Sequence, residues 1–258
     1  MPGSNPSPRQ AFPPISGEDV LMKMKQIVAC AALVAASSVA APAFAGATGN
    51  VGVFSDYMFR GVTQTGGAAV QGGLDYAFDS GFYLGTWGSN LNFAGSGGDG
   101  TEVDFYTGYA GKVGDLGFDV GALYYYYSEA EETAPATSPD TLELYAGLTY
   151  GPVGVKYYYT SEYFGTDKSA SYVNFTLAQP LTETLTLTAN IGLNDGDGVK
   201  AAFGDSYIDY SLGLAKSLDA GFTATFQIVT TDQDPAYGGG PDSDSPKVVF
   251  GLKKVFDL

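Results

Sequence analysis

The sequence predicts an all-β fold: a transmembrane, antiparallel, up-and-down β-barrel of twelve strands. Three observations lead to this fold class. Extended segments recur along the chain, with apolar side chains on one alternate set of positions and ionisable side chains on the other. The connections between these segments alternate between short and long. Aromatic residues gather beside the short connections, where a membrane interface would lie.

The first segment, residues 51–61, shows the alternation clearly. Its odd positions are mostly apolar, whereas Asp56 and Arg60 lie on the even positions, so a strand would carry both charges on one face. Tyr, Phe, Val, Thr and Leu dominate the segments, and Gly, Asp, Ser and Pro cluster between them, as strands and turns require. The predicted strands are residues 51–61, 69–78, 82–93, 102–112, 117–128, 141–150, 153–161, 172–179, 185–194, 207–216, 222–231 and 247–256.

Connection lengths support a membrane barrel independently. Five connections are tight: residues 79–81, 113–116, 151–152, 181–184 and 217–221. The connections that alternate with them are longer and polar: residues 94–101, 129–140, 162–171, 195–206 and 232–246. Outer-membrane barrels have short turns on the periplasmic side and longer loops outside. Residues 63–68 are then a short first outer loop, and no loop is long enough to be an obvious plug.

The two faces of the predicted strands differ in charge. The outward set is apolar and contains no carboxylate, whereas carboxylates collect on the inward set. A Lys or Arg on the lipid face at mid-bilayer costs about 2 to 4 kcal/mol, which explains the separation. The expected pore-lining residues are Asp56, Arg60, Asp75, Glu102, Asp104, Tyr106, Asp119, Tyr125, Glu143, Lys156, Tyr158 and Asp209.

The N-terminal 45 residues have the pattern of a targeting sequence. Residues 22–45 begin with two lysines, continue with an apolar, Ala-rich run, and end on Ala-Phe-Ala, which predicts a signal peptide cleaved before Gly46. Residues 1–21, rich in proline, are predicted to be a disordered segment that precedes the true start or extends the signal. The barrel would comprise residues 46–258.

Composition excludes several classes of function. Cleavage before Gly46 changes the formal charge from −16 to −17, and an acidic protein is a poor match for nucleic acid. The chain has no histidine, and its one cysteine, Cys30, lies in the predicted signal peptide. Without histidine the barrel lacks the commonest general base and transition-metal ligand. We therefore expect no catalytic residues, no metal site and no cofactor.

A soluble β-sandwich is the main alternative fold, since strands of such proteins are also rich in aromatic residues. It requires neither alternating loop lengths nor aromatic girdles. The sequence has both, because aromatic residues flank the tight turns and the chain end in one group and lie toward the other rim in a second. The first group is Phe78, Phe82, Tyr109, Phe118, Tyr150, Phe222 and Phe256, and the second is Tyr57, Phe59, Tyr124, Tyr126, Tyr157 and Tyr159.

Three short stretches resemble the opening of the TorF family of outer-membrane porins. They are Ser-Asp-Tyr-Met-Phe-Arg-Gly at 55–61, Gln-Gly-Gly-Leu-Asp-Tyr at 71–76 and Phe-Tyr-Leu-Gly-Thr-Trp at 82–87, and Glu102-Val103-Asp104 with residues 106–109 continues the match. The resemblance implies an outer-membrane channel of poorly defined substrate. The chain differs from the common outer-membrane ending on an aromatic residue, because Asp257 and Leu258 follow Phe256.

Arg60 is the single arginine of the predicted barrel. On one strand it would lie about 13 Å from Asp56, at 3.3 Å per residue, so its partner must come from another strand, and Asp75 is the expected one. Arg60 would either shape the field of the pore or brace its wall. Inward tyrosines would provide stacking surfaces for sugars or nucleosides, or would only fill the lumen.

The expected function is a passive pore for small hydrophilic solutes in the outer membrane, with a modest preference for cations. Twelve strands lie between filled eight-stranded barrels and wide sixteen-stranded porins, so a narrow channel is expected. The expected partners are outer-membrane lipid, lipopolysaccharide, the solutes and the barrel assembly machinery, but not nucleic acid. A non-conducting structural or adhesion barrel and an outer-membrane enzyme are the alternatives.

Overall fold

The computed structural model describes residues 46–93, 98–128, 138–233 and 245–258. The predicted signal peptide and the segment before it lie outside the described residues. Among those that are described, no helix is both long enough and apolar enough to cross a membrane.

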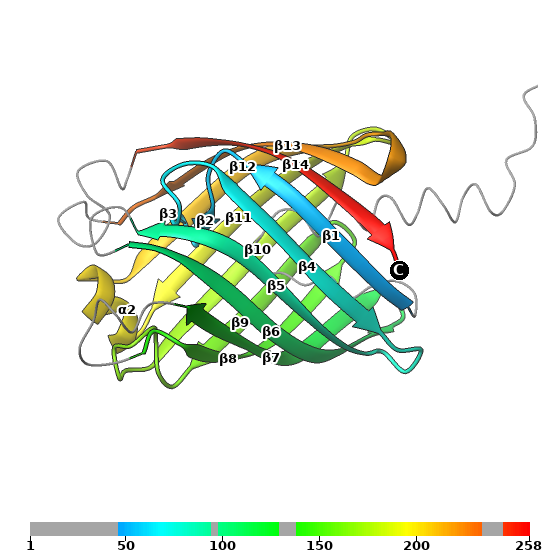
Figure 1. Ribbon diagram of the computed structural model, residues 1–258. Coiled ribbons are helices and arrows are strands. Elements are labelled where there is room, and N and C mark those ends of the chain that lie inside the picture. The colour runs from blue at the N-terminus through cyan, green and yellow to red at the C-terminus, as the bar shows by residue number, and fades with distance from the viewer. Residues whose placement is uncertain (1–45, 94–97, 129–137, 234–244) are drawn as a thin grey trace, which may run out of the picture.

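The described chain forms a closed barrel of twelve antiparallel strands, as predicted (Figure 1). Each strand pairs with its neighbours in the chain, and β1 closes the barrel by pairing with both β4 and β14. The strands are β1 (Gly46–Phe54), β4 (Ala69–Ala77), β5 (Phe82–Phe93), β6 (Gly98–Val113), β7 (Leu116–Ser128), β8 (Thr141–Tyr150), β9 (Val153–Thr160), β10 (Ala170–Pro180), β11 (Leu185–Asp195), β12 (Tyr207–Ser217), β13 (Phe222–Thr231) and β14 (Lys247–Asp257).

The five predicted tight turns all lie at one end of the barrel, which we call the turn end. The C-terminus lies at this end too (Figure 1). The opposite end, the loop end, carries residues 161–169 between β9 and β10 and the short helix α2 (Asp197–Phe203) between β11 and β12 (Figure 1). Residues 195–206 were predicted as a polar loop; the structure places α2 within them and thus differs from a purely all-β chain.

The alternation of faces is confirmed for all strands from β4 onward. On β8, the side chain of Leu144 is turned outward and is 56% exposed, whereas its neighbour Glu143 is turned into the barrel and is 1% exposed. Leu212 on β12 and Phe250 on β14 are likewise exposed outward, and Asp209 is buried inside. The outer surface is therefore an apolar band, and the lumen collects the charges.

The first predicted strand is wrong over its second half. Strand β1 covers Gly46–Phe54, and residues 55–68 leave the wall, fold into the lumen and return as β4. Within them β2 (Met58–Phe59) and β3 (Val62–Thr63) form a hairpin; we call residues 55–68 the plug hairpin. It replaces the short outer loop expected at 63–68 and contradicts the expectation that no loop forms a plug.

Side-chain hydrogen bonds explain why the chain turns inward. Ser55 ends the pairing with β14: its N–H donates to the Phe250 carbonyl, and its hydroxyl accepts from the Phe250 N–H. The Asp56 carboxylate then accepts a hydrogen bond from the Thr63 hydroxyl at 2.7 Å. The Tyr57 N–H donates to the Thr65 hydroxyl at 2.9 Å. These bonds tie the two arms of the plug hairpin together and satisfy polar groups that would otherwise be buried without partners.

Arg60 and Gly61 form the two-residue tip of the plug hairpin. Both have positive φ, 47° and 83°, which is the backbone of the tight hairpin turn that matches strand twist. The tip lies against the wall at β12 and β13, since a Cβ added at Gly61 would lie 2.8 Å from the Cβ of Asp209 on β12 and 3.2 Å from that of Thr231 on β13. Only glycine fits this turn and this contact.

Candidate functional site

Arg60 forms an ion pair with Glu143 on β8 that spans the lumen. Its Nη2 lies 2.7 and 2.8 Å from the two Glu143 carboxylate oxygens, and both side chains are 2% exposed. The plug hairpin begins and ends at β1 and β4, which are separated from β8 by three or more strands in either direction around the barrel. The ion pair therefore links the tip of the plug hairpin to a part of the wall distant from β1 and β4.

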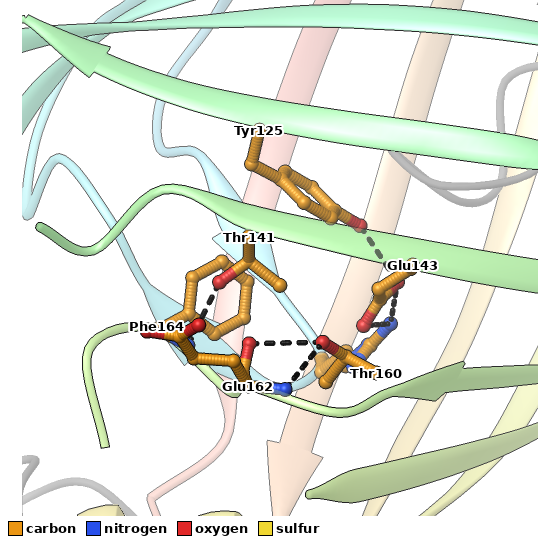
Figure 2. Close-up of polar contacts among 7 residues, drawn as sticks. Tyr125, Thr141, Glu143, Thr160, Glu162 and Phe164 are labelled. Atoms are coloured by element: carbon orange, nitrogen blue, oxygen red, sulfur yellow. Dashed lines mark hydrogen bonds and ion pairs between the residues drawn. The ribbon is translucent and has the colours of Figure 1, made fainter. Parts of the chain in front are cut away.

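Aromatic rings surround the guanidinium of Arg60. Its Cζ lies 4.2 Å from the ring centre of Tyr172 on β10, 5.5 Å from that of Tyr158 on β9 and 4.8 Å from that of Phe59. The Tyr125 hydroxyl, from β7, donates to Glu143 at 3.1 Å (Figure 2). A cation over aromatic faces gains about 2 kcal/mol when it is desolvated, so these rings strengthen the pair.

A second segment covers this group from the loop between β9 and β10. The Phe164 N–H donates to the Thr141 hydroxyl at 2.8 Å, which brings the Phe164 ring into the barrel mouth (Figure 2). That ring packs edge-on against Phe59 and Tyr125 at 5.8 and 5.3 Å. Burial raises the pKa of the neighbouring Tyr163 to about 12, so its hydroxyl stays protonated beside Arg60.

The predicted partner of Arg60 was wrong. Asp75 on β4 instead accepts a hydrogen bond from the hydroxyl of Tyr106 on β6, and its charge attracts Lys253 on β14. The prediction assumed that Arg60 continues β1, whereas the plug hairpin carries it away from the adjacent wall toward β8.

Two more predicted carboxylates, Glu102 and Asp104, lie inside on β6. Glu102 accepts a hydrogen bond from the Tyr57 hydroxyl of the plug hairpin at 2.8 Å. Asp104 is 4% exposed, and its Oδ1 has no hydrogen-bond partner among the described residues. Both are inward neighbours on one strand, so the loop end of the lumen holds two carboxyl groups in addition to Glu143, the partner of Arg60.

Closer to the turn end than the ion pair, Asp119 on β7 is the centre of a second polar group. Its carboxylate pairs with Lys156 on β9 at 2.7 Å and accepts from the Tyr83 hydroxyl at 2.6 Å. The Tyr83 hydroxyl also contacts that of Tyr145, and the Lys156 Nζ lies 3.8 Å from the Tyr145 ring centre. These contacts link four strands from β5 to β9 and brace this side of the wall.

Asp209 on β12 is held by neutral donors. Asn190 and Asn194 on β11 donate to its carboxylate at 2.9 and 3.0 Å, and the Tyr172 hydroxyl at 3.3 Å. No ion pair to Asp209 is present among the described residues. The Asp209 carboxylate is therefore held by neutral donors next to Gly61 at the hairpin tip.

Ten of the predicted pore-lining residues occupy inward wall positions, and Asp56 and Arg60 belong to the plug hairpin. Sequence reasoning missed the inward role of Tyr57 and Phe59, which were expected at the rim, and missed Phe164 altogether. Tyr83 and Tyr172 were also not named, although both follow the inward period of their strands. The alternation along β5 and β10 is the signal that could have identified Tyr83 and Tyr172 as inward residues. No sequence signal indicates the position of Phe164.

Comparison with known proteins supports the fold. The chain resembles a structure of the KdgM porin at 9% identity, with 82% of this chain and 99% of that chain covered and a TM-score of 0.55. It resembles a structure of the NanC porin at 11% identity, with 83% and 100% covered and a TM-score of 0.54. At such low identities the structural similarity shows a shared barrel fold alone. No curated protein matches the sequence.

A family model assigns the chain more directly. Residues 38–256, nearly the whole predicted barrel, match the model described as a bacterial protein of unknown function, Gcw_chp. The match is not to TorF, so the resemblance to that family stays a prediction. The chain belongs to the Gcw_chp family.

Proposed function

We propose that this protein is an outer-membrane pore for the passive diffusion of small hydrophilic solutes. The closed twelve-stranded barrel, apolar outside and polar inside, is the observation that carries the proposal. In that membrane its outer band would contact lipid and lipopolysaccharide, and the barrel assembly machinery would insert it. We assign it no enzymatic activity, since the sequence has no histidine and no catalytic constellation.

The charge of the lumen favours cations. Wall carboxylates at Asp75, Glu102, Asp104 and Asp209 have no salt-bridge partner within 4.0 Å among the described residues. A field of one sign inside a low-dielectric wall concentrates counter-ions. The solved structure titled as a complex of the KdgM porin with disordered oligogalacturonate contains an acidic ligand. We propose the opposite preference here, for cationic and neutral solutes.

The plug hairpin would be the gate of this pore. It bridges the loop end between β1, β4 and β8, and Arg60 supplies the charge that holds it. The docked arrangement is then the closed state, and conduction follows when the tip leaves the wall.

Reversal potentials under a tenfold KCl gradient test the proposal. The purified, refolded chain in a planar bilayer should show discrete, infrequent openings with a potential of the sign expected for cation selectivity. The double variant Glu102→Gln with Asp104→Asn removes two lumen charges from one patch and should move the potential toward zero, whereas Glu162→Gln, in an exposed loop, should not. Anion preference in the unmodified protein would contradict the proposal.

A non-conducting structural barrel is the second candidate. One observation favours it: the plug hairpin and Phe164 pack the loop end with buried side chains around Tyr57, Tyr125 and Tyr158. A correctly folded barrel that shows no conductance steps, even when the plug hairpin is released, would establish this second function in place of the pore.

A further inference from the structure

The surroundings of Arg60 are those of a binding site for an organic cation. The wall of the barrel supplies a carboxylate from Glu143, the Tyr125 hydroxyl that orients it, and the faces of Tyr158 and Tyr172. We call these four residues the wall cage. Carboxylate and aromatic faces together recognise guanidinium and alkylammonium groups. The plug hairpin supplies the occupant.

We propose that the wall cage is a binding site for small solutes that carry a guanidinium group, and that Arg60 is its built-in, displaceable occupant. The inference rests on the proposed function in one respect, that solutes enter the lumen. Displacement of Arg60 by a solute would release the tip of the plug hairpin and open the path that it blocks.

The wall cage is part of the barrel and does not depend on the hairpin for its shape. Its four residues come from the consecutive strands β7, β8, β9 and β10. Tyr158 and Tyr172 lie directly opposite each other in the register of β9 and β10, with ring centres 5.9 Å apart. Cross-strand aromatic pairs of this kind stabilise a sheet by themselves. The cage would therefore persist when Arg60 leaves.

The empty cage would need another cation. Glu143 is 1% exposed, and the loss of one partner of a buried pair leaves an uncompensated charge, which is strongly unfavourable. Tyr125 supplies one hydrogen bond to this carboxylate, which only partly offsets the loss. A guanidinium solute would replace both the charge and the stacking of Arg60 on Tyr172.

The occupant itself is held imperfectly. Arg60 has φ 47°, in the left-handed region that residues other than glycine seldom adopt. Its Nε is buried without a hydrogen-bond partner among the described residues. A free guanidinium has neither the strained backbone nor a fixed direction of approach, so it can use donors that Arg60 leaves unpaired.

Calorimetric titration of the refolded barrel in detergent tests the inference, with methylguanidinium as the probe and its neutral isostere methylurea as the control. Arg60→Ala empties the cage and should bind methylguanidinium at least about tenfold more tightly than the unmodified protein does. Methylurea should bind at least about tenfold more weakly than methylguanidinium, and adding Glu143→Gln to Arg60→Ala should remove the difference between the two probes.

Equal affinity of Arg60→Ala for both probes, or no effect of Glu143→Gln, would overturn the inference. The heat-dependent shift of the barrel on gels shows which variants are folded. If Arg60→Ala does not fold, Gly61→Ala takes its place, because it displaces the tip and leaves every cage residue intact. The titration requires no conduction: a silent barrel that binds methylguanidinium refutes the pore alone, and a conducting barrel that does not bind it refutes the cage alone.

Discussion

At the scale of single residues, the ion pair of Arg60 and Glu143 holds the tip of the plug hairpin against β8. The alternation of the sequence predicts the inward position of Glu143 on β8. Arg60 reaches the lumen because residues 55–68 leave the wall, so the contact between the two was not predicted. A contact across the lumen depends on how the wall closes and on where the hairpin tip lies, and neither is encoded in the spacing of residues along one strand.

Removal of the Glu143 charge should release Arg60. Glu143→Gln replaces the carboxylate with a neutral acceptor and leaves the buried guanidinium without a counter-charge. Removal of one partner of a buried ion pair costs about 3 to 5 kcal/mol, so the docking of the plug hairpin should weaken. Because Arg60 is the single arginine of residues 46–258, an arginine-specific protease should cut the folded variant there at least tenfold faster than the unmodified protein. Glu162→Gln is the control, and equal rates in both variants would refute the role of the pair.

The contact of Gly61 with the wall gives an uncharged test of the same hairpin. Gly61→Ala places a Cβ 2.8 Å from the Asp209 Cβ and forces an alanine into positive φ, so the tip should lift and the channel should open more often. Gly67→Ala, in the same hairpin, meets nothing closer than 3.9 Å and should behave as the unmodified protein. Single-channel open probability measures the difference between the two variants. If the Gly61→Ala channel opens no more often than the Gly67→Ala control, the tip is not the gate.

At the scale of elements, the sequence predicts strands well and the plug hairpin not at all. Residues 51–61 continue the apolar alternation past Phe54, so the period gives no sign of the turn at Ser55. Arg60-Gly61 is also not one of the Asn-Gly or Asp-Gly pairs that mark tight hairpins. The inward fold is instead decided by Thr63 and Thr65, whose hydroxyls satisfy Asp56 and the backbone of Tyr57.

Because side chains on β12 alternate between the two faces of the barrel, the same substitution at neighbouring positions should affect stability to different extents. Leu212→Arg puts a charge on the lipid face at a cost of about 2 to 4 kcal/mol, whereas Ser211→Arg points into the lumen, on the same face as Asp209. Urea titrations of refolding into lipid vesicles should show a loss of stability for Leu212→Arg that is clearly larger than for Ser211→Arg. Similar losses for the two variants would mean that the faces are assigned incorrectly.

At the scale of the whole molecule, barrel closure explains why the fold was predictable and the site only partly so. Alternating loop lengths and a carboxylate-free outer face predict a closed sheet, and β1 pairs with β14 as closure requires. The contents of the lumen follow from contacts between strands far apart in the sequence. Thus Asp119 with Lys156 and Glu143 with Arg60 were predicted as lining residues but not as pairs.

The most direct test of the account is the single-channel conductance of the unmodified barrel against one in which residues 57–67 are replaced by a short Gly-Ser linker, which removes Arg60 and keeps Asp56. If the plug hairpin closes a cation-preferring pore, the replacement should convert infrequent openings into a nearly continuous conductance and should make cation preference stronger, because Arg60 is lost and the wall carboxylates remain. A folded, plug-free barrel with the same conductance as the unmodified protein, or with none, would contradict the account.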